Sequence, residues 1–372
     1  MDQHFLANGL AAYVIASLLL WLLEPVARHI GLVDQPGGRK THANPTPLIG
    51  GIAMSLGFAF SVLWLDVSMS DYRLLFAGTL ILVTVGVLDD LSELKARLRF
   101  GAQIAAGLVM TLGAEVVLED LGYLVPTGHP VSLGILAVPL TIFATVGVIN
   151  AVNMSDGIDG LAASLVLVAV SALAVIAWAD AHLDALAILV LLAGVLIAFL
   201  TFNLRPNGTA SVFMGDAGSM FLGFVLAWLL VKVSQGDKRI MAPVTALWIF
   251  ALPLIDTVTM MLRRAILGRS PFLADREHFH HILLAAGFSP KQTLALAVLF
   301  AVTAASIGLA GHFLRVEEHW MFLAFVALFA VHFWMIMRAW RVKRFLQMPL
   351  LHTADMRSDL GLSRPPALER SK

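Results

Sequence analysis

Apolar runs long enough to form membrane-crossing helices recur along the whole of this chain. A helix needs about 20 mostly apolar residues to cross the hydrocarbon core of a bilayer. Runs near this length predict an all-α polytopic integral membrane protein with about eleven transmembrane helices, at residues 5–23, 48–65, 74–88, 100–118, 133–149, 161–178, 183–202, 218–233, 240–262, 293–313 and 320–337. The run at 240–262 contains Pro253 and Asp256. We therefore expect an interrupted helix near Pro253, with Asp256 near the surface.

The composition argues against several other classes of protein. Charged residues make up only 13% of the chain, against about 25% in ordinary soluble domains. The formal net charge is zero, and no basic repeat or RNA-binding motif is present, so we expect no nucleic-acid partner. The chain has no cysteine, which excludes disulfides, thiolate metal sites and cysteine nucleophiles.

The distribution of basic residues predicts the orientation in the membrane. The loops that follow odd-numbered runs, together with the C-terminal tail, carry 20 of the 25 lysines and arginines. Such residues favour the cytoplasmic side. We expect the N-terminus outside, in the periplasm, and the C-terminus in the cytoplasm. Residues 1–340 then form one transmembrane domain with five cytoplasmic loops, and residues 341–372 form a basic cytoplasmic tail that is partly disordered.

Polar clusters gather in the five loops predicted to be cytoplasmic, whereas the outer loops are short and chemically plain. The clusters are GLVDQPGGRKTHANPTPLIGG (31–51), DDLSELKARLR (89–99), NAVNMSDGIDGLA (150–162), RPNGTASVFMGDAGS (205–219) and RRAILGRSPFLADREHFHH (263–281). Because the five loops share one membrane face, they can converge on a single active site at the cytoplasmic surface.

The second loop opens with Asp89 and Asp90, which follow a short apolar run. A helix over residues 74–88 rises only about 22 Å, so we expect this pair in a recess of the membrane surface. Magnesium is typically held by one or two carboxylates together with phosphate oxygens. The alternative is a solvated helix end, next to basic residues that contact lipid headgroups.

In the third loop, Asn150, Asn153 and Asp156 recur every third residue and therefore lie along one side of a helix end. Asp159 follows in the same loop. A helix cap and a turn would explain one or two of these residues. Four such residues favour a polar pocket.

The fourth and fifth loops add anionic and cationic candidates. Asp216 opens a helix, and a helix N-terminus suits a phosphate, while Phe213 could stack on a base or pack inside the protein. The fifth loop contains Arg264 and the histidines of HFHH, His278, His280 and His281. Their spacing matches none of the usual zinc patterns, so contacts with a diphosphate or with lipid headgroups are favoured.

Carboxylates on one face indicate a divalent cation, and the cation with the arginines indicates phosphate. The residues thus predict metal-assisted phosphoryl transfer at the cytoplasmic surface. A transporter or lipid flippase is the alternative from another class, but its ionisable residues would gather near the middle of the membrane.

The motifs RKTHANPTPLIGG, VLDDLSELKARLR, NAVNMSDGIDGLA, FMGDAGS and SPFLADREHFHH, in this order, resemble those of the polyprenyl-phosphate N-acetylhexosamine-1-phosphate transferases. They cover the chain from about residue 31 to residue 290. The HFHH form resembles the bacterial branch that uses undecaprenyl phosphate and UDP-N-acetylglucosamine (UDP-GlcNAc). The branch that makes lipid I usually has three consecutive histidines, and a lysine shortly before the Pro-Thr-Pro turn that is missing here.

The resemblance implies transfer of N-acetylglucosamine 1-phosphate from UDP-GlcNAc to undecaprenyl phosphate, with UMP as the second product. It implies that Asp216 and Asn153 hold Mg²⁺ or Mn²⁺, and that Asp89, supported by Asp90, orients or deprotonates the lipid phosphate. The resemblance also implies contacts between uridine and Asn150, Asp156, Asp159 and Phe213. It implies contacts between the sugar and diphosphate and Arg264, His278, His280 and His281. It also implies direct attack by the lipid phosphate and a lipid groove at the broken run.

The implied setting is the bacterial inner membrane, at the first membrane step of a cell-surface polysaccharide such as O-antigen or common antigen. The sequence leaves open another UDP-linked sugar, such as GalNAc or fucosamine. It also leaves open the oligomeric state, with a homodimer as one option.

Overall fold

The computed structural model of this protein describes residues 2–35, 45–65, 70–126, 128–205, 210–266, 268 and 278–338. The predicted tail at 341–372 lies outside these residues. Each of the eleven predicted apolar runs lies on one or two helices. They are α1 (Asp2–Ile30), α2 (Gly50–Val62), α3 (Arg73–Ser92), α4 (Ala96–Leu108) with a π-helical turn (Val109–Gly113), α5 (Ala137–Ser155), α6 (Leu161–Ala179), α7 (Leu183–Asn203), α8 (Gly215–Lys232), α9 (Pro243–Ile249) with α10 (Ala251–Ile266), α12 (Pro290–Phe313) and α13 (Glu318–Met337).

The remaining elements are short. Helix α11 (Phe279–Ala285) precedes α12, and two 3₁₀ turns cover Ser70–Tyr72 and Gly134–Leu136. Strand β1 (Val33–Asp34) pairs antiparallel with β2 (Thr46–Pro47). Among the described residues, eight helices are long and apolar enough to cross a membrane, or nine if α9 and α10 form one bent span. The all-α polytopic fold is therefore confirmed, whereas the count of eleven spans and the orientation stay predictions.

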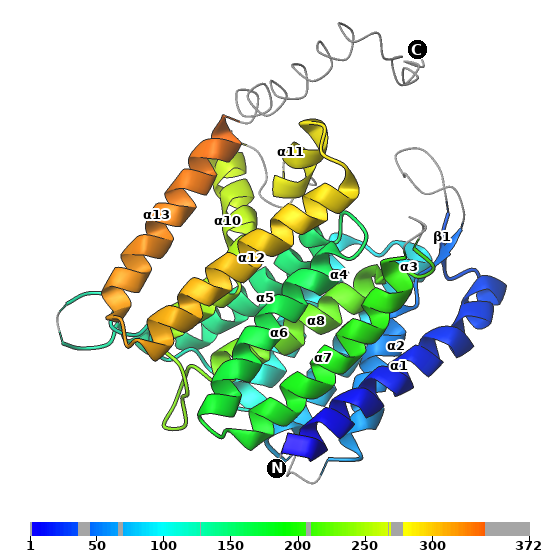
Figure 1. The fold of residues 1–372 in the computed structure, drawn as a ribbon, viewed down its shortest axis with the longest axis horizontal. Coiled ribbons are helices and arrows are strands. Elements are labelled where there is room, and N and C mark those ends of the chain that lie inside the picture. Colours follow the sequence, from blue (N-terminus) through cyan, green and yellow to red (C-terminus); the bar gives the residue numbers. More distant parts are fainter. Residues whose placement is uncertain are drawn as a thin grey trace, which may run out of the picture.

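Helix α8 lies in the middle of the bundle and packs against α2, α3, α5 and α6. Small residues allow two of these contacts, because a Cβ at Gly51 or Gly86 would collide with the backbone of α8 at Gly218 or Ala217. Helices α1 and α13 lie at opposite margins of the bundle (Figure 1). The start of α8 is thus held by its neighbours on several sides.

The predicted interruption is present as an 88° bend between α9 and α10. It lies at Phe250, three residues before Pro253. Pro253 falls in the first turn of α10, where a missing N–H leaves no intrahelical hydrogen bond unmade. We expected Asp256 to lie near the surface at the break. It lies instead farther along α10 and is buried, with 9% of its surface exposed.

Helix α3 is longer than its apolar run. It continues through Asp89 and Asp90 to Ser92, and its 20 residues rise about 30 Å. The expected recess therefore does not arise from a short helix. Asp89 is buried instead by the packing of the helices around it.

Candidate active site

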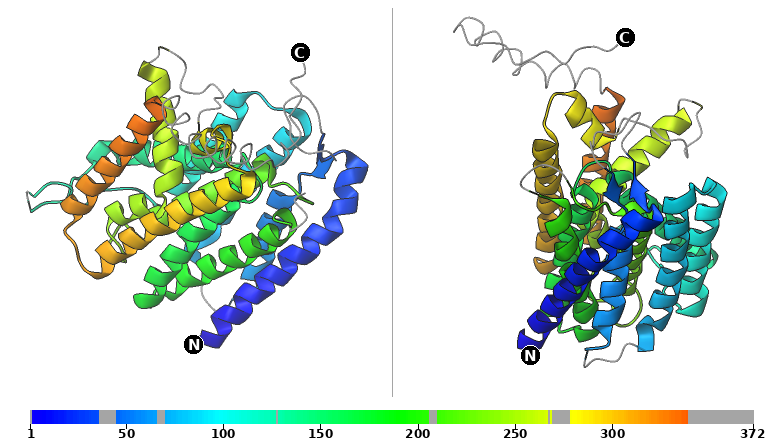
Figure 2. Two further views of the ribbon diagram at one scale, coloured as in Figure 1. Left: turned by 45° about the horizontal axis from the view of Figure 1, so that its top comes forward. Right: turned by 90° about the vertical axis from the view of Figure 1, so that its right-hand side faces the viewer.

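The described parts of the five loops predicted to be cytoplasmic lie at one end of the bundle, towards the top of Figure 1, and Figure 2 shows this end from two further directions. Backbone hydrogen bonds join the first loop to the fourth, because Phe213 N donates to Pro47 O and Gly50 N donates to Phe213 O. The second and third loops also reach the start of α8. The fifth loop reaches the third, since the ring of His280 occupies the place that a Cβ at Gly157 would need.

The carboxylate of Asp90 caps the N-terminus of α8. Its Oδ1 accepts a hydrogen bond from Asp216 N at 2.8 Å, and its Oδ2 accepts one from Ala217 N at 3.3 Å. Gly215 enters the helix with φ +69°, a conformation that favours glycine. Asp90 thus accepts from two of the free N–H groups at this helix end, and a contact with a substrate phosphate there stays a prediction.

Arg99 joins the two other carboxylates of the cluster. Its Nη1 donates to Asp89 Oδ2 at 3.0 Å and lies 3.6 Å from Asp216 Oδ2. The second oxygen of Asp89 accepts from Leu94 N at 2.6 Å, just after the left-handed turn at Glu93 that ends α3. Sequence reasoning placed Arg99 near lipid headgroups only in its alternative interpretation of this loop, and it missed this role. Its place ten residues after Asp89, at the start of the next helix, was the only signal.

Asn153 and Asp216 are brought together as predicted. Asn153 Nδ2 donates to Asp216 Oδ1 at 2.5 Å and to Ser219 Oγ at 2.8 Å. Helix α5 ends just beyond Asn153, so its last turn faces the first turn of α8. The side chain of Asp216 is 27% exposed, which leaves its carboxylate accessible from the loop side.

The other candidates of the third loop are placed differently. Asn150 Nδ2 donates to Gln103 Oε1 on α4 at 2.8 Å and to Val146 O at 2.7 Å, so this amide ties α5 to α4. Asp156 and Asp159 lie on the exposed loop. Burial of its carboxyl by surrounding protein, with repulsion from Asp216 and Asp159, raises the pKa of Asp156, although the residue as a whole keeps solvent-exposed surface. The expected contacts with uridine stay predictions for Asn150, Asp156, Asp159 and the half-buried Phe213.

The histidines of the fifth loop stand at the start of α11. His278 and His280 are buried, and their rings are nearly parallel with centroids 6.0 Å apart. His281 packs on His280 at 4.2 Å. Burial, with a smaller effect from His281, lowers the pKa of His280 to about 3, so this ring is neutral near pH 7. Arg264 is also buried, near the end of α10.

The oxygen donors at the start of α8 fit a hard divalent cation. Among the described residues, no three His, Asp or Glu side chains could hold a metal ion together. The available donors are the Asp216 carboxylate and the amide oxygen of Asn153. A partial set of this kind suits Mg²⁺, which is usually held by few protein oxygens and completed by water and substrate phosphates.

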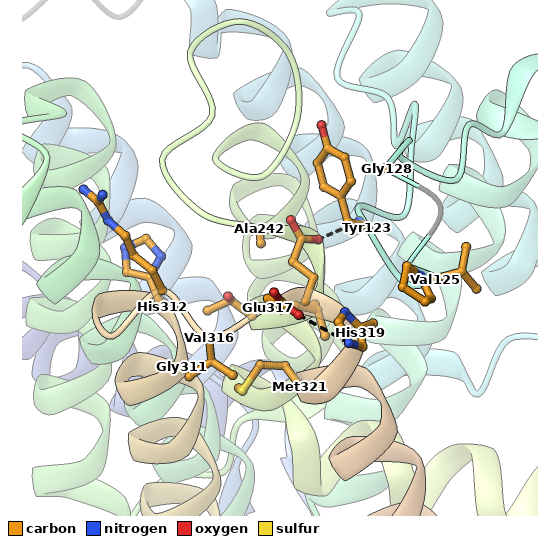
Figure 3. A pocket seen from close by; sticks show the side chains of 15 residues that line it. Tyr123, Val125, Gly128, Ala242, Gly311, His312, Val316, Glu317, His319 and Met321 are labelled. Carbon is orange, nitrogen blue, oxygen red and sulfur yellow. Dashed lines mark hydrogen bonds and ion pairs between the residues drawn. The ribbon is translucent and has the colours of Figure 1, made fainter.

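One cavity in the described part of the chain lies away from these residues. It has a volume of about 530 Å³ and lies between the loop around Tyr123, the end of α12 at Gly311 and the start of α13 (Figure 3). Tyr123 N donates to Glu318 beside it. None of the predicted site residues lines it, so it is not the site of the predicted chemistry.

Comparison with known proteins places this arrangement in a family. Residues 72–234 match the family described as glycosyl transferase family 4. The chain is 37% identical over 340 residues, covering 91% of this chain and 92% of the relative, to the undecaprenyl-phosphate alpha-N-acetylglucosaminyl 1-phosphate transferase of Escherichia coli K12. Proteins with the same name from Yersinia pestis and Haemophilus influenzae are each 37% identical, over 90% and 89% of this chain and 92% and 94% of their own lengths. The chain therefore belongs to the family of the undecaprenyl-phosphate N-acetylglucosaminyl 1-phosphate transferases.

Proposed function

We propose that this protein transfers N-acetylglucosamine 1-phosphate from UDP-GlcNAc to undecaprenyl phosphate. An oxygen of the lipid phosphate attacks the β-phosphorus of the sugar nucleotide, the bond from that phosphorus to the bridging oxygen breaks, and UMP leaves. The products are GlcNAc-diphospho-undecaprenol and UMP. The names of the relatives support undecaprenyl phosphate as the acceptor and N-acetylglucosamine 1-phosphate as the group transferred.

One observation carries the proposal: Arg99, Asp89, Asp216 and Asn153, from three separate loops, are joined by hydrogen bonds and ion pairs at one end of an apolar bundle. A lipid phosphate reaches such a site from the membrane, and a sugar nucleotide reaches it from water. The cluster combines acidic groups with a cation, which suits reaction between two phosphorylated substrates.

Each residue of the cluster has its own proposed role. Arg99, with 36% of its side chain exposed, offers a positive group to a phosphate, and Asp89 holds it in place. Asp90 fixes the start of α8 and so places Asp216. A phosphate monoester is already largely ionised near neutral pH, so attack does not require Asp89 to remove a proton.

Asp216 and Asn153 would hold Mg²⁺, with Mn²⁺ as the alternative. When bound, the cation offsets negative charge on the diphosphate as UMP leaves. The histidines of α11 and Arg264 would contact the sugar and diphosphate, while Asp156, Asp159 and Phe213 would contact uridine. The setting would be the bacterial inner membrane, with the site facing the cytoplasm, at the first membrane step of a cell-surface polysaccharide.

The test is UMP release by the purified protein in detergent, with undecaprenyl phosphate, Mg²⁺ and a panel of UDP-sugars that includes UDP-GlcNAc, UDP-GalNAc and UDP-linked fucosamine. We expect lipid-dependent UMP release with UDP-GlcNAc and its loss when EDTA is added. Preference for another UDP-sugar would overturn the substrate assignment. No release with any sugar would overturn the transferase proposal and favour a transport role.

A further inference from the structure

A buried carboxylate on α10 holds the histidine segment of the fifth loop. Asp256 Oδ2 lies 2.9 Å from His278 Nδ1, and Asp256 Oδ1 accepts from Phe279 N at 3.0 Å. His332 Nε2, on α13, lies 3.4 Å from the same Oδ1. Three elements thus meet at one acid. A buried carboxylate is tolerated only when hydrogen-bond donors and positive groups surround it. These three contacts therefore act together to stabilise the Asp256 carboxylate.

This pairing decides how His278 presents its ring. A carboxylate can only accept hydrogen bonds, so Nδ1 of His278 carries the proton that points to Asp256. The other ring nitrogen, Nε2, is then left for a further partner. The same carboxylate also satisfies the first free backbone N–H of α11, at Phe279. Asp256 therefore fixes both the rotation of the His278 ring and the start of the helix that carries it.

The contacts around His278 continue to the third loop. The His280 ring lies nearly parallel to that of His278, and its Nε2 is buried without a hydrogen-bond partner in the described residues. That nitrogen faces Gly157, where no Cβ would fit. A small cavity of about 10 Å³ lies between Ser155, Asp256 and His280. Packed groups thus run from α13 through Asp256 and the histidines to the third loop.

We propose that Asp256 is a positioning residue for the sugar-nucleotide site, acting through His278, with His332 as its second support. The proposal rests on the proposed function only in that His278 contacts the sugar nucleotide. It adds that Asp256 on α10, after the bend, and His332 on α13 determine how the histidines meet that substrate.

The experiment measures steady-state kinetics of Asp256→Asn in the full-length protein, with each substrate varied in turn. The asparagine keeps the shape but not the charge. We expect kcat/KM for UDP-GlcNAc to fall by roughly tenfold or more, as for other residues that orient a ligand-binding histidine. KM for undecaprenyl phosphate should stay within about twofold, because the proposal places His278 against the sugar nucleotide and not against the lipid phosphate. Equal changes in KM for both substrates would overturn the proposal.

A double-mutant cycle separates positioning from mere support of the fold. If Asp256 acts through His278, Asp256→Asn should change kcat/KM little further in a His278→Gln background, because contacting residues are not additive. Independent, additive losses would overturn the proposal. His332→Gln should give a smaller loss of kcat/KM with the same substrate selectivity. An unchanged kcat/KM would overturn the supporting role of His332.

Thr259→Val is the matched control. Thr259 lies on the same helix, is fully buried and makes no hydrogen bond through its hydroxyl in the described residues. The variant should keep wild-type kinetics, and a substrate-selective loss equal to that of Asp256→Asn would overturn the proposal. All variants are assayed with whichever UDP-sugar the wild type prefers, so an error in the assigned sugar is distinguishable from an error here.

Discussion

Arg99 sits between two acids that come from distant parts of the chain, and its charge is what allows them to lie close together. We expect Arg99→Gln to lower kcat/KM by roughly 100-fold, because the variant loses the positive group that pairs with Asp89 and faces a substrate phosphate. The measurement is UMP release at saturating Mg²⁺. Arg97→Gln, an exposed position on the same helix, is the control and should keep its activity.

Asp216 and Asp89 should each be required for turnover. Asparagine at either position removes a negative charge while it keeps the shape, so Asp216→Asn and Asp89→Asn should abolish UMP release while the protein still inserts and purifies normally. Asp237→Asn, an exposed aspartate elsewhere in the chain, should behave as wild type. If either test variant formed lipid product at the wild-type rate, its assigned role would be wrong.

His280 gives the stability of the protein a predictable dependence on pH. Its pKa is about 3 in the folded protein and about 6.5 in an unfolded chain. The unfolded state therefore binds a proton that the folded state excludes. The stability due to the neutral ring is complete above pH 6.5 and is lost as the pH falls towards 3. Between pH 6 and pH 4, the free energy of unfolding of the wild type should fall more steeply than that of His280→Gln, by up to about 1.4 kcal/mol per pH unit. Parallel curves from thermal unfolding in detergent would contradict this.

The resemblance to the transferase family was enough to predict that Asn153 and Asp216 lie together, whereas residue types and their order predicted only that the polar loops converge. They were not enough to assign each polar side chain its partner. Asp90 caps α8 and Asn150 bonds Gln103, and both pairings depend on how helices distant in sequence are rotated against one another. Single-sequence patterns carry no information on that rotation, which also explains why Arg99 was missed.

Helix α8 can hold Asp216 in place only because its neighbours approach closely. Gly86 on α3 faces the backbone of Ala217, next to Asp216. Gly86→Ala should push the two helices apart, at a cost of about 1–3 kcal/mol for overpacking, and it should reduce activity by displacing Asp216. Thermal stability and UMP release both report the change. Gly147→Ala is the control, because a Cβ there meets open space.

The apolar runs predicted nearly every helix, because a bilayer permits few other structures. They did not predict where the helices end. Helix α3 continues past its apolar run to include both acidic residues, and the bend of the ninth run lies at Phe250 rather than at Pro253. Packing against neighbouring helices determines such ends and bends, and hydropathy alone does not report it.

The arrangement of the whole bundle brings the five polar loops to one end, while the sidedness of that end is a prediction from basic residues. The chain has no cysteine, so single cysteines can be labelled cleanly in intact cells. Ser92→Cys should react with a membrane-impermeant maleimide only after permeabilisation. His129→Cys, in a loop predicted to lie outside, should react directly. Both positions are exposed, and the reverse pattern would invert the topology.

The cap that Asp90 places on α8 joins groups 126 residues apart in the chain. A ribosome produces α3 well before α8, so during synthesis this carboxylate has no N–H groups to accept from. Until α8 enters the bilayer, Asp90 has to remain hydrated, because an unpaired charge is expensive in hydrocarbon. The nascent chain must therefore keep the end of α3 at the water boundary, and the candidate active site takes shape only when the later helix arrives.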